Sequence, residues 1–243
     1  MIRVDGRDPA KMRDVRITAN PLRHPDGSAM IEVGQTRVLC AATCQDSPPP
    51  HRKGTGLGWL TAEYAMLPGS TPDRVPRDGM KGKVAPRSSE IQRLVGRVLR
   101  SVFRMDKFGE RTIVIDCDVI EADGGTRTAA ITGGFVALAL AVRKLRAEGR
   151  TAAALLTDFV AATSVGIVEG VPVLDLCYLE DSQAGVDMNV AVTGSGRFVE
   201  VQGTAEGHAF ERGELDGMLD LAQAGCARLV AARKEVLGCE TLE

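Results

Sequence analysis

The sequence has few aromatic residues and almost no net charge. Aromatic residues make up 4% of its 243 residues, and the formal net charge is −2. So few aromatic side chains argue against binding of nucleic acid by extensive base stacking. Without an overall positive charge, any contact with nucleic acid must depend on local clusters of arginine and lysine.

Several common site motifs are also absent. The six cysteines form no Cys-x-x-Cys pair and the three histidines are scattered, which disfavours a zinc site. Most of the cysteines lie in apolar patterns, so we expect buried, reduced thiols. There is no Gly-x-x-x-x-Gly-Lys-Ser/Thr loop and no Gly-x-Ser-x-Gly turn, which argues against a P-loop NTPase and an α/β-hydrolase.

Long apolar runs are missing as well. No run of 18 apolar residues occurs, and the N-terminal residues lack the apolar core of a signal peptide. We therefore expect no membrane span and a cytoplasmic protein. Hydrophobic residues at 44% and charged residues at 26% are typical of a globular protein, and the length suffices for one large domain or two small ones.

Hydrophobic periodicity predicts two similar halves, each made of strands followed by helices. We therefore predict an α+β fold in which residues 1–243 form one compact unit. Gly34-Gln35 is the expected hairpin turn between two strands, and Ser88 or Ser89 is the expected cap of the first helix. The expected strands are 15–18, 28–33, 36–42, 59–66, 111–121, 162–168, 171–178, 187–192 and 197–202, and the expected helices are 88–102, 126–148 and 214–236.

A long connection precedes the first helix. Residues 45–87 contain a Pro-Pro-Pro run and several glycines, and they are too long for an ordinary loop, so we expect part of the segment to be functional or mobile. Its basic residues are Arg52, Lys53, Arg74, Arg77, Lys81, Lys83 and Arg87.

The most informative motif is Gly124-Gly125-Thr126-Arg127, at the junction of an expected strand and helix. Backbone N–H groups at a helix start lack partners within the helix, and the helix dipole adds positive potential there. Glycine lets an anion approach the backbone, and Arg127 supplies a planar set of donors. The motif predicts a phosphate site; a tight turn with a surface arginine is the alternative.

A second motif gathers carboxylates. Asp175, Glu180, Asp181 and Asp187 lie at the end of one expected strand and the start of the next, where a short loop can bring Asp181 and Asp187 together. Clustered carboxylates repel one another and need a cation or a proton to coexist. They suit either magnesium binding or general acid catalysis, and a solvated acidic loop is the alternative. Together with the phosphate motif, they favour phosphoryl transfer on a phosphodiester.

Longer stretches, which begin at Asp5-Gly6-Arg7 and reach the final helix, are specific to one family. They include Leu60-Thr61-Ala62-Glu63-Tyr64-Ala65-Met66-Leu67-Pro68, Glu90-Ile91-Gln92-Arg93-Leu94, Asp116-Cys117-Asp118-Val119, Ala122-Asp123-Gly124-Gly125-Thr126-Arg127-Thr128 and Glu180-Asp181-Ser182 with Asp187-Met188-Asn189. Through them the chain resembles bacterial ribonuclease PH, a phosphate-dependent 3′→5′ exoribonuclease that trims tRNA precursors.

This resemblance implies a ribonuclease PH fold, related to the second domain of ribosomal protein S5. It implies that inorganic phosphate is the co-substrate, that nucleoside 5′-diphosphates are released from RNA 3′ ends, and that the reaction can be reversed. It also implies a homohexamer built as a trimer of dimers. The residues that match the family motifs are Arg87, Gly125, Thr126 and Arg127 for phosphate, Asp181 and Asp187 for catalysis, and Arg74 and Arg77 for tRNA.

Two departures from the family pattern occur. Gly69 stands where an arginine is common, which weakens the expected grip on tRNA, and Pro86 stands where glycine is common before Arg87. Whether Asp187 donates a proton or holds Mg²⁺ with Asp181 stays open. The rival functions are a non-catalytic RNA-binding subunit of an exosome-like ring, a hydrolytic nuclease, and a role in ribosome assembly.

Overall fold

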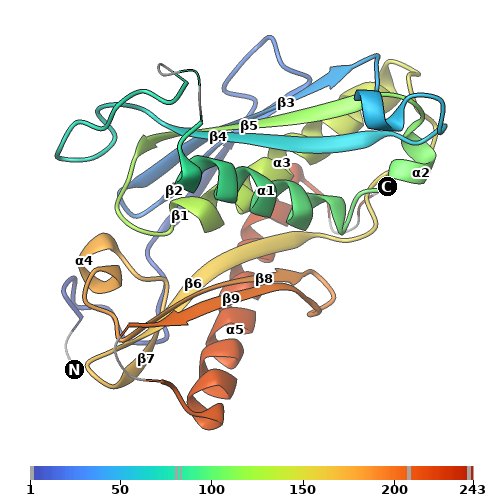
Figure 1. Cartoon of the computed structure of the whole chain (residues 1–243). Coiled ribbons are helices and arrows are strands. Elements are labelled where there is room, and N and C mark those ends of the chain that lie inside the picture. The colour runs from blue at the N-terminus through green and yellow to red at the C-terminus, as the bar shows by residue number, and fades with distance from the viewer. Residues whose placement is uncertain (1–2, 80–81, 83, 207–208, 240–241, 243) are drawn as a thin grey trace.

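Two β-sheets, one from each half of the chain, organise the fold (Figure 1). The computed structural model describes residues 3–79, 82, 84–206, 209–239 and 242. The first sheet has the order β1 (Val15–Ala19), β2 (Gly27–Val33), β3 (Thr36–Gln45), β5 (Thr112–Glu121) and β4 (Trp59–Met66). The second sheet has the order β7 (Val171–Leu174), β6 (Val160–Val168), β8 (Val186–Thr193) and β9 (Phe198–Ala205).

All neighbouring strands are antiparallel except β4 and β5, which are parallel. A crossover through a helix is therefore needed between them, and α1 supplies it. The helical elements are η1 (Pro50–Arg52), α1 (Pro86–Arg100), α2 (Met105–Phe108), α3 (Thr126–Ala147), α4 (Tyr178–Asp181) and α5 (Arg212–Leu237).

The helix α3 lies between the two sheets and contacts β2, β3 and β6 (Figure 1). Its sequence is apolar nearly all round, and most of its residues are buried. Close packing depends on small residues: a Cβ at Gly133 would lie 2.7 Å from the Ile31 side chain. This helix is long and apolar enough to cross a membrane, but 83% of its most apolar window is buried inside the protein, which makes it a core helix.

One large hydrophobic cluster includes residues from both sheets and from α1, α3 and α5. The α+β arrangement and most element boundaries agree with the prediction. The expected burial of most cysteines is also confirmed, because Cys40, Cys117, Cys177 and Cys226 are buried free thiols.

Two local predictions are wrong. Neither Ser88 nor Ser89 caps α1, since the helix begins at Pro86 with Ala85 as its N-cap and no side-chain cap. Ser88 lies inside the first turn, and its hydroxyl donates instead to the Asp78 carboxylate. The expected strand over residues 171–178 ends at Leu174, because the next residue has left-handed backbone geometry, and α4 follows.

Candidate active site

The phosphate-binding prediction centres on the turn between β5 and α3. Gly124 and Gly125 have φ angles of +75° and +68°, the left-handed region that favours glycine. Gly125 is the N-cap of α3 and offers no side-chain cap, so the first N–H groups of α3 are available to a ligand. We call residues 124–127 the cradle.

Side chains from the first sheet hold the cradle in place. The Thr36 hydroxyl at the β2–β3 turn donates to the Gly124 carbonyl at 2.7 Å and accepts the Asp123 N–H at 2.9 Å. The Tyr64 hydroxyl of β4 donates to the Thr126 hydroxyl at 2.9 Å. The Thr36 hydroxyl thus orients the backbone of the turn and the Tyr64 hydroxyl orients the Thr126 side chain, so the cradle is held in place by the protein itself.

Two arginines approach the cradle from different helices. Arg87 is the second residue of α1, where Pro86 presets the backbone of the first helical position. Arg127 lies in the first turn of α3 with its side chain 18% exposed, 3.5 Å from the Glu90 carboxylate. Its guanidinium also donates to the Gln202 side chain of β9 at 3.3 Å. The start of each helix adds positive potential beside its arginine.

The predicted pair of acids is brought together: Asp187 lies at the start of a strand, as expected, whereas Asp181 lies in a short helix instead of a loop. Asp181 is the last residue of α4 and is exposed, whereas Asp187 is half-buried as the second residue of β8. Burial, followed by the negative charge of Asp181, raises the pKa of Asp187 to about 6, while Arg127 and Arg87 act in the opposite direction. Asp187 therefore holds a proton far more readily than an ordinary aspartate.

The other two carboxylates of the predicted cluster serve a different purpose. Asp175 and Glu180 are buried, with exposed fractions of 3% and 1%. Arg13 pairs with Asp175 at 2.7 Å, and Arg3 pairs with Glu180 at 2.6 Å. Their charges are thus neutralised by arginines from the N-terminal segment, and of the four predicted carboxylates only Asp181 and Asp187 face the cavity described next.

One cavity of about 390 Å³ unites the site. It contains all six residues predicted to act on phosphate or in catalysis, and also side chains that the motifs had not assigned a role, such as Ser164 and Asn189. Its lining residues are Met66, Thr71, Val75, Arg87, Ala122, Gly124, Gly125, Thr126, Arg127, Ser164, Tyr178, Asp181, Asp187 and Asn189.

The two arginines predicted to contact RNA lie outside this cavity. Arg74 and Arg77 are exposed in the loop between β4 and α1. The same loop reaches the cavity through Thr71 and Val75. The backbone of this loop is hydrogen-bonded to the segment between β5 and the cradle, because the Ala122 N–H donates to the Ser70 carbonyl at 2.8 Å.

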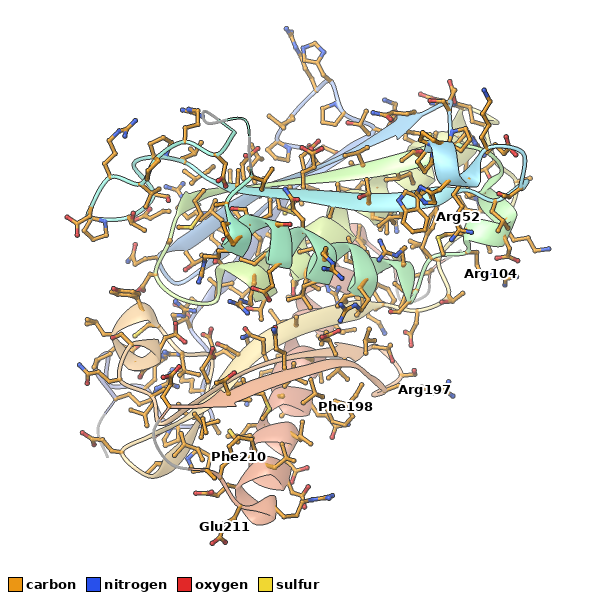
Figure 2. The ribbon with its side chains drawn as sticks, viewed as in Figure 1. Arg52, Arg104, Arg197, Phe198, Phe210 and Glu211 are labelled. Atoms are coloured by element: carbon orange, nitrogen blue, oxygen red, sulfur yellow. The ribbon has the colours of Figure 1, made fainter. Side chains whose placement is uncertain are left out.

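The remaining basic residues of the long connection do not form one group. Arg52 stacks over the Trp59 ring at 4.9 Å, and Figures 1 and 2 show it at the other end of the molecule from α4. Lys81 and Lys83 lie outside the described residues. Among the described residues of this connection, those that line the cavity are Met66, Thr71, Val75 and Arg87.

The acidic side chains of the cavity suit a magnesium ion that is shared with substrate. Among the described residues, no group of three or more histidine, cysteine, aspartate or glutamate side chains could hold a metal. Mg²⁺ commonly uses one or two carboxylates, keeps several waters and takes the rest of its ligands from substrate phosphates. Asp181 and Asp187 in a cavity of this volume fit that pattern.

Sequence reasoning missed the residues that support the site from a distance. Arg3, Arg13, Thr36 and Tyr64 contact the cradle or the approach to α4, yet none of them lies within twenty positions of it along the chain. Two family motifs were available signals: Asp5-Gly6-Arg7 in the N-terminal segment, and the stretch from Leu60 to Pro68, which contains Tyr64.

Comparison with known proteins agrees with this geometry. Residues 11–144 match the model of the 3′ exoribonuclease family, domain 1, and residues 158–225 match domain 2. Ribonuclease PH of Syntrophomonas wolfei subsp. wolfei is 55% identical over 238 residues, which cover 98% of this chain and 100% of that protein. Ribonuclease PH of Solibacter usitatus is 55% identical over 236 residues, which cover 97% and 99%.

Solved structures with lower identity confirm the predicted fold. Rice (Oryza sativa) Rrp46 has a TM-score of 0.78 at 19% identity and covers 97% of this chain and 100% of its own. The Archaeoglobus fulgidus exosome with RNA bound to the active site has a TM-score of 0.78 at 20% identity, with 94% and 91% covered. With both family domains matched in order and relatives of one kind along nearly its whole length, the chain belongs to the ribonuclease PH group of the 3′ exoribonuclease family.

Proposed function

We propose that this protein is a phosphate-dependent 3′→5′ exoribonuclease that trims the 3′ ends of tRNA precursors and releases nucleoside 5′-diphosphates. The observation that carries the proposal is the cavity in which two arginines, a helix start without a side-chain cap and two aspartates meet. A scaffold protein would have no need for an aspartate whose pKa is raised toward neutral pH.

Inorganic phosphate is the proposed nucleophile. Arg87, Arg127 and the N–H groups of the cradle would bind it, since charge-assisted hydrogen bonds suit phosphate oxygens. Two guanidinium groups offset most of the charge of the phosphate dianion. This neutralisation lowers the repulsion between phosphate and the anionic phosphodiester that it attacks.

The chemical step exchanges one phosphorus–oxygen bond for another. An oxygen of inorganic phosphate attacks the phosphorus of the terminal phosphodiester, and the bond from phosphorus to the ribose 3′-oxygen breaks. We propose that Asp187 donates its proton to that 3′-oxygen as general acid, because its pKa of about 6 keeps a useful protonated fraction near neutral pH. The products are a nucleoside 5′-diphosphate and RNA shortened by one nucleotide. A phosphoanhydride replaces a phosphodiester, so the reaction is expected to run backwards when diphosphates are supplied.

Asp181 and Asp187 are also the residues that would hold Mg²⁺. When bound, the ion would supply charge stabilisation to phosphate oxygens. The protein's own contribution is to place both carboxylates beside the cradle, on α4 and β8. Proton donation by Asp187 and metal binding by the pair predict different pH dependence of the phosphorolysis rate, so the pH profile distinguishes the two roles.

RNA is proposed to enter past the loop that carries Arg74 and Arg77. These exposed cations would contact the tRNA backbone, and such contacts weaken as salt rises. We further propose that residues 1–243 act as one unit, supported by the shared hydrophobic cluster, and that the protein works in the cytoplasm as a homohexamer, a trimer of dimers.

The decisive experiment is a trimming assay on a tRNA precursor with magnesium, with and without inorganic phosphate, in which the released nucleotide is identified. Diphosphates that appear only with phosphate are expected. Monophosphates released without phosphate would mean hydrolysis and would refute the proposal. No release in either condition would favour an RNA-binding subunit or a role in ribosome assembly without turnover.

A further inference from the structure

Arg13, in the segment before β1, makes more polar contacts around the cavity than either proposed phosphate-binding arginine. It is 7% exposed. Its backbone N–H and its Nε donate to one oxygen of Asp175 at 2.8 and 3.0 Å, and a terminal nitrogen donates to the other oxygen at 2.7 Å. Both carboxylate oxygens of Asp175 thus accept hydrogen bonds from Arg13.

The same guanidinium also reaches the cradle. Arg13 donates to the carbonyl of Asp123, to that of Gly124 at 3.5 Å and to that of Leu176 at 3.3 Å. Asp123 and Gly124 belong to the turn before α3, whereas Leu176 belongs to the segment that leads into α4. One side chain therefore binds the phosphate-binding turn of the first half and the acid-bearing segment of the second half.

Backbone geometry at this contact is unusual. Asp175 has a φ of +58°, a left-handed conformation that costs free energy at a residue other than glycine. The two segments also touch directly, because a Cβ at Gly124 would lie 2.6 Å from the Leu176 carbonyl oxygen. Such strain persists only where the surrounding contacts determine the conformation. Arg13 and Arg7 donate to the Asp175 carboxylate, and Arg3 and Arg7 donate to its backbone carbonyl. Of these arginines, Arg13 is the one that also donates to the cradle turn.

From this arrangement we infer that Arg13 and Asp175 together form a positioning pair, which fixes the distance between the phosphate cradle and the segment that carries Asp181. The inference rests on the proposed function. Arg13 does not line the cavity, so it acts on phosphate through the cradle and not by contact. Misplacement of reacting groups by about 1 Å can reduce the rate by about 100-fold.

A second pair holds α4 itself. Arg3 donates to both oxygens of Glu180, at 2.7 and 2.6 Å, and Glu180 also accepts the Cys177 N–H at 3.1 Å. On its other side, α4 is tied to the cradle turn, since the Tyr178 N–H donates to Asp123 at 3.2 Å. α4 is thus anchored, and Arg13 adds the contacts that join the cradle turn to the segment leading into α4.

The test is the steady-state kinetics of Arg13→Lys in the full-length protein. Lysine keeps the charge but lacks the planar set of donors that binds the carboxylate and the carbonyls at once. We expect kcat/KM for phosphate to fall about 10- to 100-fold, with KM for RNA within about twofold of wild type. Phosphate should also raise the melting temperature of the variant less than that of wild type.

Arg111→Lys is the matched control. Arg111 donates to the Phe108 carbonyl at 3.1 and 2.6 Å and to the Arg150 carbonyl at 2.9 Å, and it does not line the cavity. We expect Arg111→Lys to lower the melting temperature and to leave KM for phosphate unchanged. If both variants change KM for phosphate equally, Arg13 is merely structural and the inference fails.

Asp175→Asn keeps the shape of the aspartate side chain but removes its charge. This variant tests the same pair if Arg13→Lys does not fold. When both single variants fold, the double variant should lose no more activity than the worse single one, because both changes break one contact. Normal phosphate kinetics in either folded variant would overturn the inference while leaving phosphorolysis intact. Wild-type protein that releases no diphosphate would instead overturn the proposed function.

Discussion

Replacement of Asp187 by asparagine is expected to make the protein more stable and much less active. The pKa of Asp187 rises from 3.8 to about 6 on folding. A carboxyl whose pKa is raised by folding destabilises the folded state once the pH exceeds the unfolded value, and the full cost is reached above the folded value. Asparagine has the same shape and no charge to bury.

The size of the effect follows from the shift. A change of about two pKa units corresponds to about 3 kcal/mol at pH 7.5 and to about half of that at pH 5. Asp187 is only half-buried, so solvent screening reduces this value, and we expect Asp187→Asn to gain about 1 to 3 kcal/mol at pH 7.5. For a chain of this length, that gain raises the melting temperature by about 2 to 10 °C.

Activity should change in the opposite direction. If Asp187 is the general acid, the wild-type rate constant for phosphorolysis falls about tenfold per pH unit well above pH 6, as the protonated fraction declines. The asparagine variant should be about 100-fold slower at pH 6 and should lose this dependence.

Thermal melts at pH 5 and 7.5, together with single-turnover rates between pH 5 and 8.5, measure both effects. Asp220→Asn, at an exposed carboxylate on α5, is the control and should change neither. A variant no more stable than wild type at pH 7.5 would show that Asp187 is not strained by burial. Wild-type activity in Asp187→Asn would remove its catalytic role.

Three further outcomes are expected. Asp181→Asn removes the neighbouring charge, so the pKa of Asp187 should fall, and the decline of the rate should begin at lower pH in the same single-turnover assay. Gly124→Ala places a Cβ 2.6 Å from a backbone carbonyl oxygen at a φ of +75°, and it should lower the melting temperature and abolish stabilisation by phosphate. Joint replacement of Arg74 and Arg77 by alanine should raise KM for tRNA precursors and reduce its salt dependence, without affecting KM for phosphate. If the salt dependence of KM for tRNA precursors does not change, RNA does not bind at Arg74 and Arg77.

The fold was largely predictable because its local signals agree with one another. The helix α1 has an apolar stripe of helical period, and α3 is apolar nearly all round, as a helix between two sheets must be. The cap of α1 was not predictable, because a serine near a helix start resembles a cap in sequence. In the structure Asp78, ten residues before Ser88, accepts its hydroxyl and draws it away from that role.

The strand over residues 171–178 failed for a related reason. Its sequence is apolar and β-branched, but Asp175 adopts a left-handed backbone in order to meet Arg13. Local propensity contains no information about a partner 162 positions away. Here tertiary contacts override the local preference, and they do so beside the site, where such conflicts are expected.

The acidic cluster shows most clearly what a sequence leaves undetermined. Four carboxylates within thirteen positions appear equivalent by composition, and the need of such a cluster for a cation or a proton was inferred correctly. The structure divides them: Asp175 and Glu180 receive their cations from Arg13 and Arg3, and they become structural. Of the four, only Asp181 and Asp187 line the cavity, where burial and the charge of Asp181 raise the pKa of Asp187. These two share the cavity with Arg87 and Arg127 and stay available for chemistry, and which two they are depends on where Arg3 and Arg13 fold.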